Sequence, residues 1–139
     1  MSQMPKPLEV YANHLKTLGY EIEEREISII ARKEETQFVF ATSDEPKYVM
    51  AATRYELNRE MIEKNKLEVL EFVNTINSED LHHLYIDLEE GNSFLVINWL
   101  FFGKYDKEDF TNFMREIEVL ELEILAALVK SGFTKFFLE

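Results

Sequence analysis

The chain has 139 residues, a formal net charge of −12, 46% apolar residues and no cysteine. The length is that of one domain, and the apolar content excludes a disordered chain. Without cysteine there are no disulfides, no thiol catalysis and no cysteine metal site. The acidic balance, with no basic cluster, argues against nucleic acid and against anionic membranes as partners. We expect one domain over residues 1–139.

The first ten residues contain no apolar segment of the length found in signal peptides. The longest nearly apolar run, residues 94–102, is too short for a membrane-spanning helix, which needs about 20 residues. Together with the absence of cysteine, these features predict a cytoplasmic protein.

The first half of the chain predicts a helix followed by an antiparallel meander. Apolar residues recur at helical spacing over residues 5–18, and Gly19 is placed to end that helix. Residues 20–55 then alternate between apolar and polar types, with polar turns at 33–36 and 43–47.

The second half predicts a helix, a hairpin and a long closing helix. The middle helix runs from about residue 57 to residue 76, and the hairpin strands 83–88 and 93–102 follow. The closing helix spans about Asp106 to Lys130, with Asp106 as its N-cap. The apolar tail after Gly132 should dock on the protein rather than extend into water.

This order of elements predicts an α+β fold. Strands with short connections, grouped between helices, favour an antiparallel sheet of five to six strands in the order α-β(3-4)-α-β-β-α. We expect the three helices on one face or at the ends of that sheet.

The closing helix carries two apolar stripes instead of one. The first stripe, centred on Ile117, is expected to pack on the core. The second stripe consists of Val119, Leu122, Ala126 and Val129, spaced three, four and three residues apart. It predicts the contact surface of a twofold dimer. The alternative is that the first helix or the apolar tail covers it within one subunit.

The strand 93–102 is apolar on both faces and therefore needs cover on both sides. Trp99 and Phe101 are its candidates for subunit or partner contact. An alternative places Trp99, the only tryptophan, in the wall of an apolar ligand pocket.

No constellation of residues supports catalysis. His82 and His83 are adjacent and point to opposite faces of a strand, so they cannot easily share a metal. We expect the histidines, His14 included, at the surface or at strand ends. Glu121 falls within the core arc of the closing helix, and its charge predicts a position at the rim. The sequence therefore predicts no catalytic, cofactor-binding or metal-binding residue, and no enzyme.

Three segments carry a resemblance. Residues 72–77 read F-V-N-T-I-N, residues 83–99 read H-L-Y-I-D-L-E-E-G-N-S-F-L-V-I-N-W, and residues 104–110 read K-Y-D-K-E-D-F. This pattern resembles the YbjN-like family of bacterial proteins, which has N-x-x-N near the end of its middle helix, then a hairpin, then a polar cap on the last helix. We expect Asn74 and Asn77 to bond backbone groups at the helix end.

The resemblance implies a fold similar to class I type III secretion chaperones, which are small, acidic, α+β and usually dimeric. Members of the YbjN-like family are often described as sensory transduction regulators. The family has no catalytic residue that could be assigned to a position in this sequence. We expect a non-enzymatic homodimer that binds a peptide or protein partner, with the acidic surface favouring a basic one. The alternative is a small-ligand-binding regulatory domain with its pocket near Trp99.

Overall fold

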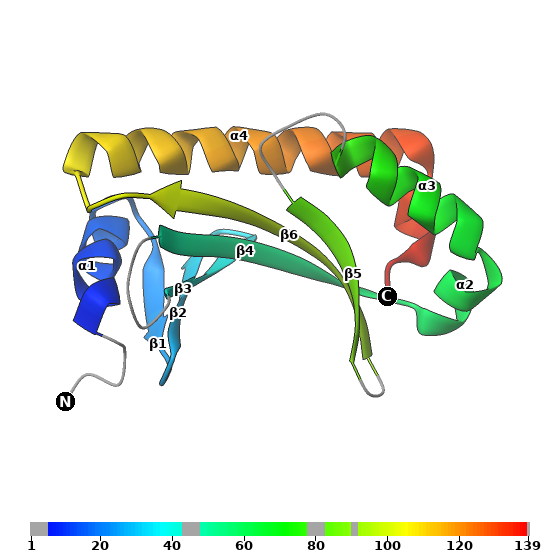
Figure 1. The fold of residues 1–139 in the computed structure, drawn as a ribbon, viewed down its shortest axis with the longest axis horizontal. Coiled ribbons are helices and arrows are strands. Elements are labelled where there is room, and N and C mark those ends of the chain that lie inside the picture. The colour runs from blue at the N-terminus through cyan, green and yellow to red at the C-terminus, as the bar shows by residue number, and fades with distance from the viewer. Residues whose placement is uncertain (1–5, 43–47, 78–82, 90–91, 139) are drawn as a thin grey trace. The chain divides into compact units, whose positions relative to one another are not determined.

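The computed structural model describes residues 6–42, 48–77, 83–89 and 92–138. Its strands form one six-stranded sheet in the order β1-β2-β3-β4-β6-β5 (Figure 1). The pairs β1–β2, β2–β3, β3–β4 and β5–β6 are antiparallel. The predicted α+β class, meander and hairpin are confirmed. The predicted turn at 43–47, the tip of the hairpin at 90–91 and His82 lie outside the described residues.

The chain divides into two compact units, which are described separately. Unit 1 comprises the residues up to Thr53 together with Trp99–Met114, and unit 2 comprises Arg54–Asn98 together with Arg115–Glu139. Strands β4 and β6 and helix α4 each contribute residues to both units.

Unit 1 contains the first helix and most of the meander. Its elements are the 3-10 turn η1 (Lys6–Leu8), α1 (Glu9–Thr17), β1 (Glu21–Glu24), β2 (Ser28–Lys33), β3 (Thr36–Thr42), the start of β4 (Tyr48–Leu57), the end of β6 (Asn92–Phe102) and the start of α4 (Lys107–Ser131). Gly19, at a φ of 96°, follows α1 as expected. Asp106 caps α4, accepting a hydrogen bond at 2.9 Å from the backbone N–H of Asp109.

The core of unit 1 is aromatic. Phe38, Phe40 and Phe110 are fully buried, and the ring of Phe110 lies 6.3 Å from that of Phe40 and 5.0 Å from that of Tyr11. The alternation predicted for β3 places Phe38 and Phe40 on this core face. Helix α1 and the first turns of α4 therefore pack on the same face of the unit 1 sheet.

Unit 2 contains the middle helices, the hairpin and the tail. Its elements are the end of β4, α2 (Arg59–Lys64), α3 (Lys66–Asn77), β5 (His83–Glu89), most of β6, most of α4 and the 3-10 turn η2 (Phe133–Phe136). The hairpin register places Leu84 opposite Ile97 and Ile86 opposite Leu95. Leu84, Leu95 and Ile97 are fully buried, so these pairs lie on the core side of the hairpin.

The apolar tail docks, as predicted. Phe133 and Phe136 are 2% and 0% exposed, and Leu57 and Phe137 form an isolated antiparallel bridge. The backbone N–H of Asn58 donates to the carbonyl oxygen of Phe136 at 2.7 Å. Gly132, at a φ of 78°, separates α4 from η2 and permits this change of direction.

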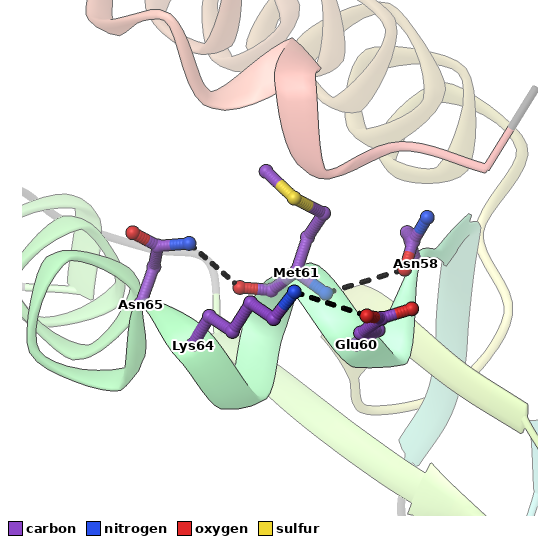
Figure 2. A network of polar contacts seen from close by, with 5 residues as sticks. All are labelled: Asn58, Glu60, Met61, Lys64 and Asn65. Carbon is purple, nitrogen blue, oxygen red and sulfur yellow. Dashed lines mark hydrogen bonds and ion pairs between the residues drawn. The ribbon is translucent and has the colours of Figure 1, made fainter.

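The prediction of one continuous middle helix over 57–76 is wrong, because Asn58 caps its start and Asn65 divides it into α2 and α3. The side chain of Asn58 accepts from the N–H of Met61 at 3.2 Å, and the side-chain amide of Asn65 donates to the Met61 carbonyl oxygen at 2.9 Å (Figure 2). Asn65 leaves the helical region at a φ of −131°, and its own carbonyl accepts from Val69. It thus ends one helix and begins the next.

Candidate functional site

The second apolar stripe of α4 is exposed to solvent in unit 2. Val119, Leu122 and Val129 are 54%, 66% and 68% exposed, and Ala126 is also exposed. We call these four residues the α4 stripe. The tail, which belongs to the same unit, does not cover them. The first stripe behaves as predicted, because its members at Ile117, Ile124 and Leu128 are buried in the core.

Trp99 and Phe101, the two predicted contact residues of β6, are buried within unit 1. Trp99 is 2% exposed and lies edge-on to Phe38, with ring centroids 6.0 Å apart. Phe101 packs against Phe110 at 5.5 Å. The indole Nε1 of Trp99 has no hydrogen-bond partner within the described part of the chain. Whether either residue takes part in a subunit interface stays a prediction.

The exposed apolar side chains of β6 in unit 1 are those on its other face. Leu100 is 43% exposed and Phe102 is 68% exposed, and both alternate with the buried Trp99 and Phe101. The sequence identified the strand as apolar on both faces. It could not tell which face the helices would cover, because that depends on the packing of α1 and α4.

Each unit has a hollow of moderate size. In unit 2, a hollow of about 580 Å³ lies between α3, the end of α4 and η2, with the stacked rings of Phe72 and Phe133 in its lining. In unit 1, a hollow of about 240 Å³ is lined by residues that include Tyr11, Tyr48 and Tyr105. Trp99 lines neither of them, so these hollows are not the apolar pocket that was expected around it.

His14 is buried, at 6% exposure, and the expectation of a surface histidine is wrong for it. Its Nδ1 lies 2.8 Å from the hydroxyl of Tyr105, and its Nε2 lies 2.9 Å from Oγ1 of Thr111. Burial, and secondly the positive charge of Lys107, lower the pKa of His14 below 6.5. Burial also raises the pKa of Tyr11, which shares this cluster, and Tyr105 adds to that increase.

The directions of its hydrogen bonds indicate that His14 has a structural role. The Thr111 hydroxyl donates to the carbonyl oxygen of Lys107, so it accepts from Nε2–H of His14. Nδ1 then carries a lone pair, to which Tyr105 donates. Neutral His14 has both nitrogens satisfied, and neither nitrogen is left to take a proton from a substrate.

Glu121 is 5% exposed, so the expectation of a position at the rim is wrong. It shares the inward side of α4 with Ile117, Ile124 and Leu128. Among the described residues, no group of three His, Cys, Asp or Glu side chains is arranged to hold a metal ion. In the same part of the chain, no helix is both long and apolar enough to cross a membrane.

Asn77 has the backbone role expected for it. Its side-chain oxygen accepts from the N–H of Leu84 and its amide nitrogen donates to the carbonyl oxygen of Leu84, both at 2.7 Å. In an antiparallel pair, a residue whose N–H and C=O both point away from its partner strand leaves an open sheet edge. Asn77 covers that edge at the start of β5.

A solved structure shows the same fold over most of the chain. YbjN from E. coli, described as a proposed transcription regulator, is similar with a TM-score of 0.73 and 15% sequence identity, covering 95% of this chain and 96% of that chain. The expected YbjN-like fold is therefore confirmed, and at this identity the likeness concerns the fold alone. No family model and no curated protein matches the chain.

Proposed function

We propose that the chain is a non-enzymatic protein-interaction module that forms a homodimer and binds a peptide or protein partner. The observation that carries this proposal is the α4 stripe. A surface helix normally exposes its polar side and buries one apolar stripe. Here Leu122 and the other three residues of the α4 stripe expose apolar side chains to solvent on successive turns of the helix.

A second copy is the simplest partner for the α4 stripe, because a twofold axis places the same stripe on both sides of the contact. The spacing of three, four and three residues is the seam spacing of paired helices. Burying a side chain the size of Leu122 or Val129 contributes on the order of 1.5–3 kcal/mol each. We further propose a cytoplasmic location, which the absence of cysteine supports.

Two other functions have less support. A regulatory domain with a ligand pocket around Trp99 is disfavoured because that side chain is enclosed in the core of unit 1. A YbjN-type regulator or a secretion-chaperone-like protein agrees with the fold, and the likeness to a proposed transcription regulator supports the first of these. Both are interaction proteins and fall within the proposal.

Light scattering coupled to size exclusion tests the dimer. The native chain should give twice its 16.5 kDa, or 33 kDa. Leu122→Lys should give a folded monomer, because an ammonium group replaces an apolar side chain in the seam. Glu123→Gln is the matched control, since it also raises the net charge by one unit on an exposed position outside the stripe. This control should stay dimeric.

A native chain of 16.5 kDa would contradict the dimer. A native dimer whose Leu122→Lys variant keeps the native mass would contradict the α4 stripe as its contact surface. Far-UV circular dichroism shows whether each variant is folded. The exposure of Leu122, at 66%, predicts that its replacement leaves the fold intact.

A further inference from the structure

The sheet of unit 1 has a second apolar face, on the side opposite its aromatic core. Strand register defines it, because residues directly opposite one another share a face and successive residues alternate. Val39 lies opposite both Ile30 and Ala52, in a row across three strands. In the next row, Ala41 lies opposite both Ser28 and Met50.

Strand β6 extends the same side. Its exposed residues Leu100 and Phe102 alternate with core residues, and the ring of Phe102 lies 6.1 Å from that of Tyr48 on β4. We call Ile30, Val39, Met50, Leu100 and Phe102 the outer face. An antiparallel sheet with one face on the core usually has polar residues on the other face. The outer face departs from that rule on four strands.

The described helices of unit 1 do not cover the outer face. Helix α1 and the start of α4 pack on the aromatic side, where Tyr11 and Phe110 contact Phe101 at ring distances of 6.2 and 5.5 Å. Phe102, the next residue, is 68% exposed. A large aromatic side chain exposed beside other apolar side chains is typical of an interaction surface.

The charge around the outer face determines which partner fits. Glu23 on the edge strand β1 lies opposite Ile30, and Glu21 lies opposite Arg32, so both glutamates are on the outer side. Glu23 pairs with Arg25 and Arg32, whereas Glu21 is exposed. Residues 21–35 contain six glutamates and three basic residues, in a chain whose net charge is −12. A second copy would bring the same negative charge to this surface. A basic segment would bring the opposite charge.

We propose that the outer face binds an amphipathic basic segment of a protein partner, with its apolar side chains on Phe102, Leu100 and Met50 and its Lys or Arg side chains toward the exposed Glu21. This inference rests on the proposed function, because it names the surface and the chemistry of the partner. Tyr48 also lines the hollow of about 240 Å³ in unit 1, which offers room for one anchoring side chain beside the outer face.

A designed peptide tests the proposal with the full-length chain. The probe is an amphipathic helix of Leu and Lys, with a Leu/Glu peptide of the same pattern as the charge-reversed control. Fluorescence anisotropy gives the dissociation constant, and methyl NMR locates the peptide on the native chain. We expect the Leu/Lys peptide to shift the methyl signals of Ile30, Val39 and Met50, and the Leu/Glu peptide to shift none.

Two variants separate this surface from the dimer seam. Phe102→Ser should weaken binding of the Leu/Lys peptide at least about tenfold, whereas Leu122→Lys should leave it unchanged. Both positions are more than 60% exposed, so both variants should fold. Leu100→Ser provides a second variant on the same face.

Three results would overturn the inference. The first is that the Leu/Lys peptide fails to bind or binds no better than the Leu/Glu peptide. The second is that it binds but shifts the methyl groups of Leu122 and Val129 instead, in which case partner binding survives and this surface is wrong. The third is that Phe102→Ser turns a native dimer into a monomer, which would make a second copy the occupant. Light scattering of Leu122→Lys still decides the dimer independently.

Discussion

His14 links three segments of unit 1 through one imidazole ring, since it lies on α1 and contacts Tyr105 before α4 and Thr111 within α4. The neutral ring satisfies both of its partners. In the protonated ring, Nδ1–H would face a phenol that now donates toward it, and Tyr105 would have to turn its own proton elsewhere. Burial and the nearby Lys107 also oppose the added charge.

We expect stability to fall as the pH falls below the ordinary histidine pKa of 6.5. Because the pKa of His14 is lowered in the folded chain, the unfolded chain binds the proton more readily, and acid favours unfolding. The contribution is fully present above pH 6.5 and is lost as the pH falls through the lowered pKa. NMR titration of the histidine signals checks it, with His14→Gln to assign the signal. A His14 pKa at or above 6.5 would contradict the expectation.

Asn77 is a second residue whose side-chain hydrogen bonds should contribute to stability. Asn77→Ala leaves the N–H and C=O of Leu84 without partners and should cost about 1–3 kcal/mol in urea unfolding. Asn77→Asp keeps the acceptor but turns a carboxylate oxygen toward the Leu84 carbonyl, so its cost should be larger at pH 7 than at acid pH. Asn74 is exposed on the same helix, and within the described part of the chain its side chain does not make the backbone bond that was expected for it. Asn74→Ala is therefore the control and should stay within about 0.5 kcal/mol.

At the scale of elements, apolar periodicity predicted most of the fold because it reports which side of an element is buried. It placed α4, the alternation of β3 and the two hairpin strands well. It could not divide α2 from α3, since the hydrogen bond of Asn65 to the Met61 carbonyl oxygen leaves the apolar pattern unchanged. His14 was misplaced for a similar reason, because its partners are 91 and 97 residues away in the sequence.

The docking of the tail should contribute strongly to stability. Phe136 is fully buried, and its carbonyl oxygen accepts from Asn58 at 2.7 Å. Phe136→Ala should cost about 3–5 kcal/mol, because a large buried ring leaves a cavity. With a urea slope of about 2 kcal/mol per molar, the midpoint should fall by roughly 2 M.

Leu138→Ala is the matched control for Phe136, because Leu138 is 50% exposed and its backbone bond to Glu56 survives the change. It should cost less than about 1 kcal/mol. Equal midpoints for the two variants would mean that the tail does not contribute to the core. If Phe136→Ala fails to fold, Phe136→Leu replaces it. Its urea midpoint should also lie below that of Leu138→Ala, by a smaller difference.

For the whole molecule, the net charge of −12 gives the two proposed contacts opposite responses to salt. Two copies repel one another, so screening should strengthen the dimer. A basic peptide is attracted, so screening should weaken its binding. Between about 0.05 and 0.5 M NaCl, light scattering should show more dimer while anisotropy shows weaker peptide binding. Parallel trends would mean that charge does not distinguish the two contacts.

Whether the two units unfold together is the remaining property of the whole chain. The boundaries between them fall inside β4, β6 and α4, after Thr53, Asn98 and Met114, and not in linkers. A continuous strand or helix loses its backbone hydrogen bonds on both sides of such a boundary when either side unfolds. We therefore expect one cooperative transition, as the prediction of a single domain requires.

Trp99 makes this expectation measurable. The only tryptophan is buried in unit 1, whereas Phe136 belongs to unit 2. Phe136→Ala should therefore lower the urea midpoint seen by Trp99 fluorescence as much as the midpoint seen by far-UV circular dichroism. If the fluorescence midpoint stays at the native value while the circular dichroism divides into two transitions, the units unfold independently. In that case Phe102→Ser and Leu122→Lys would each report on the unit that carries them.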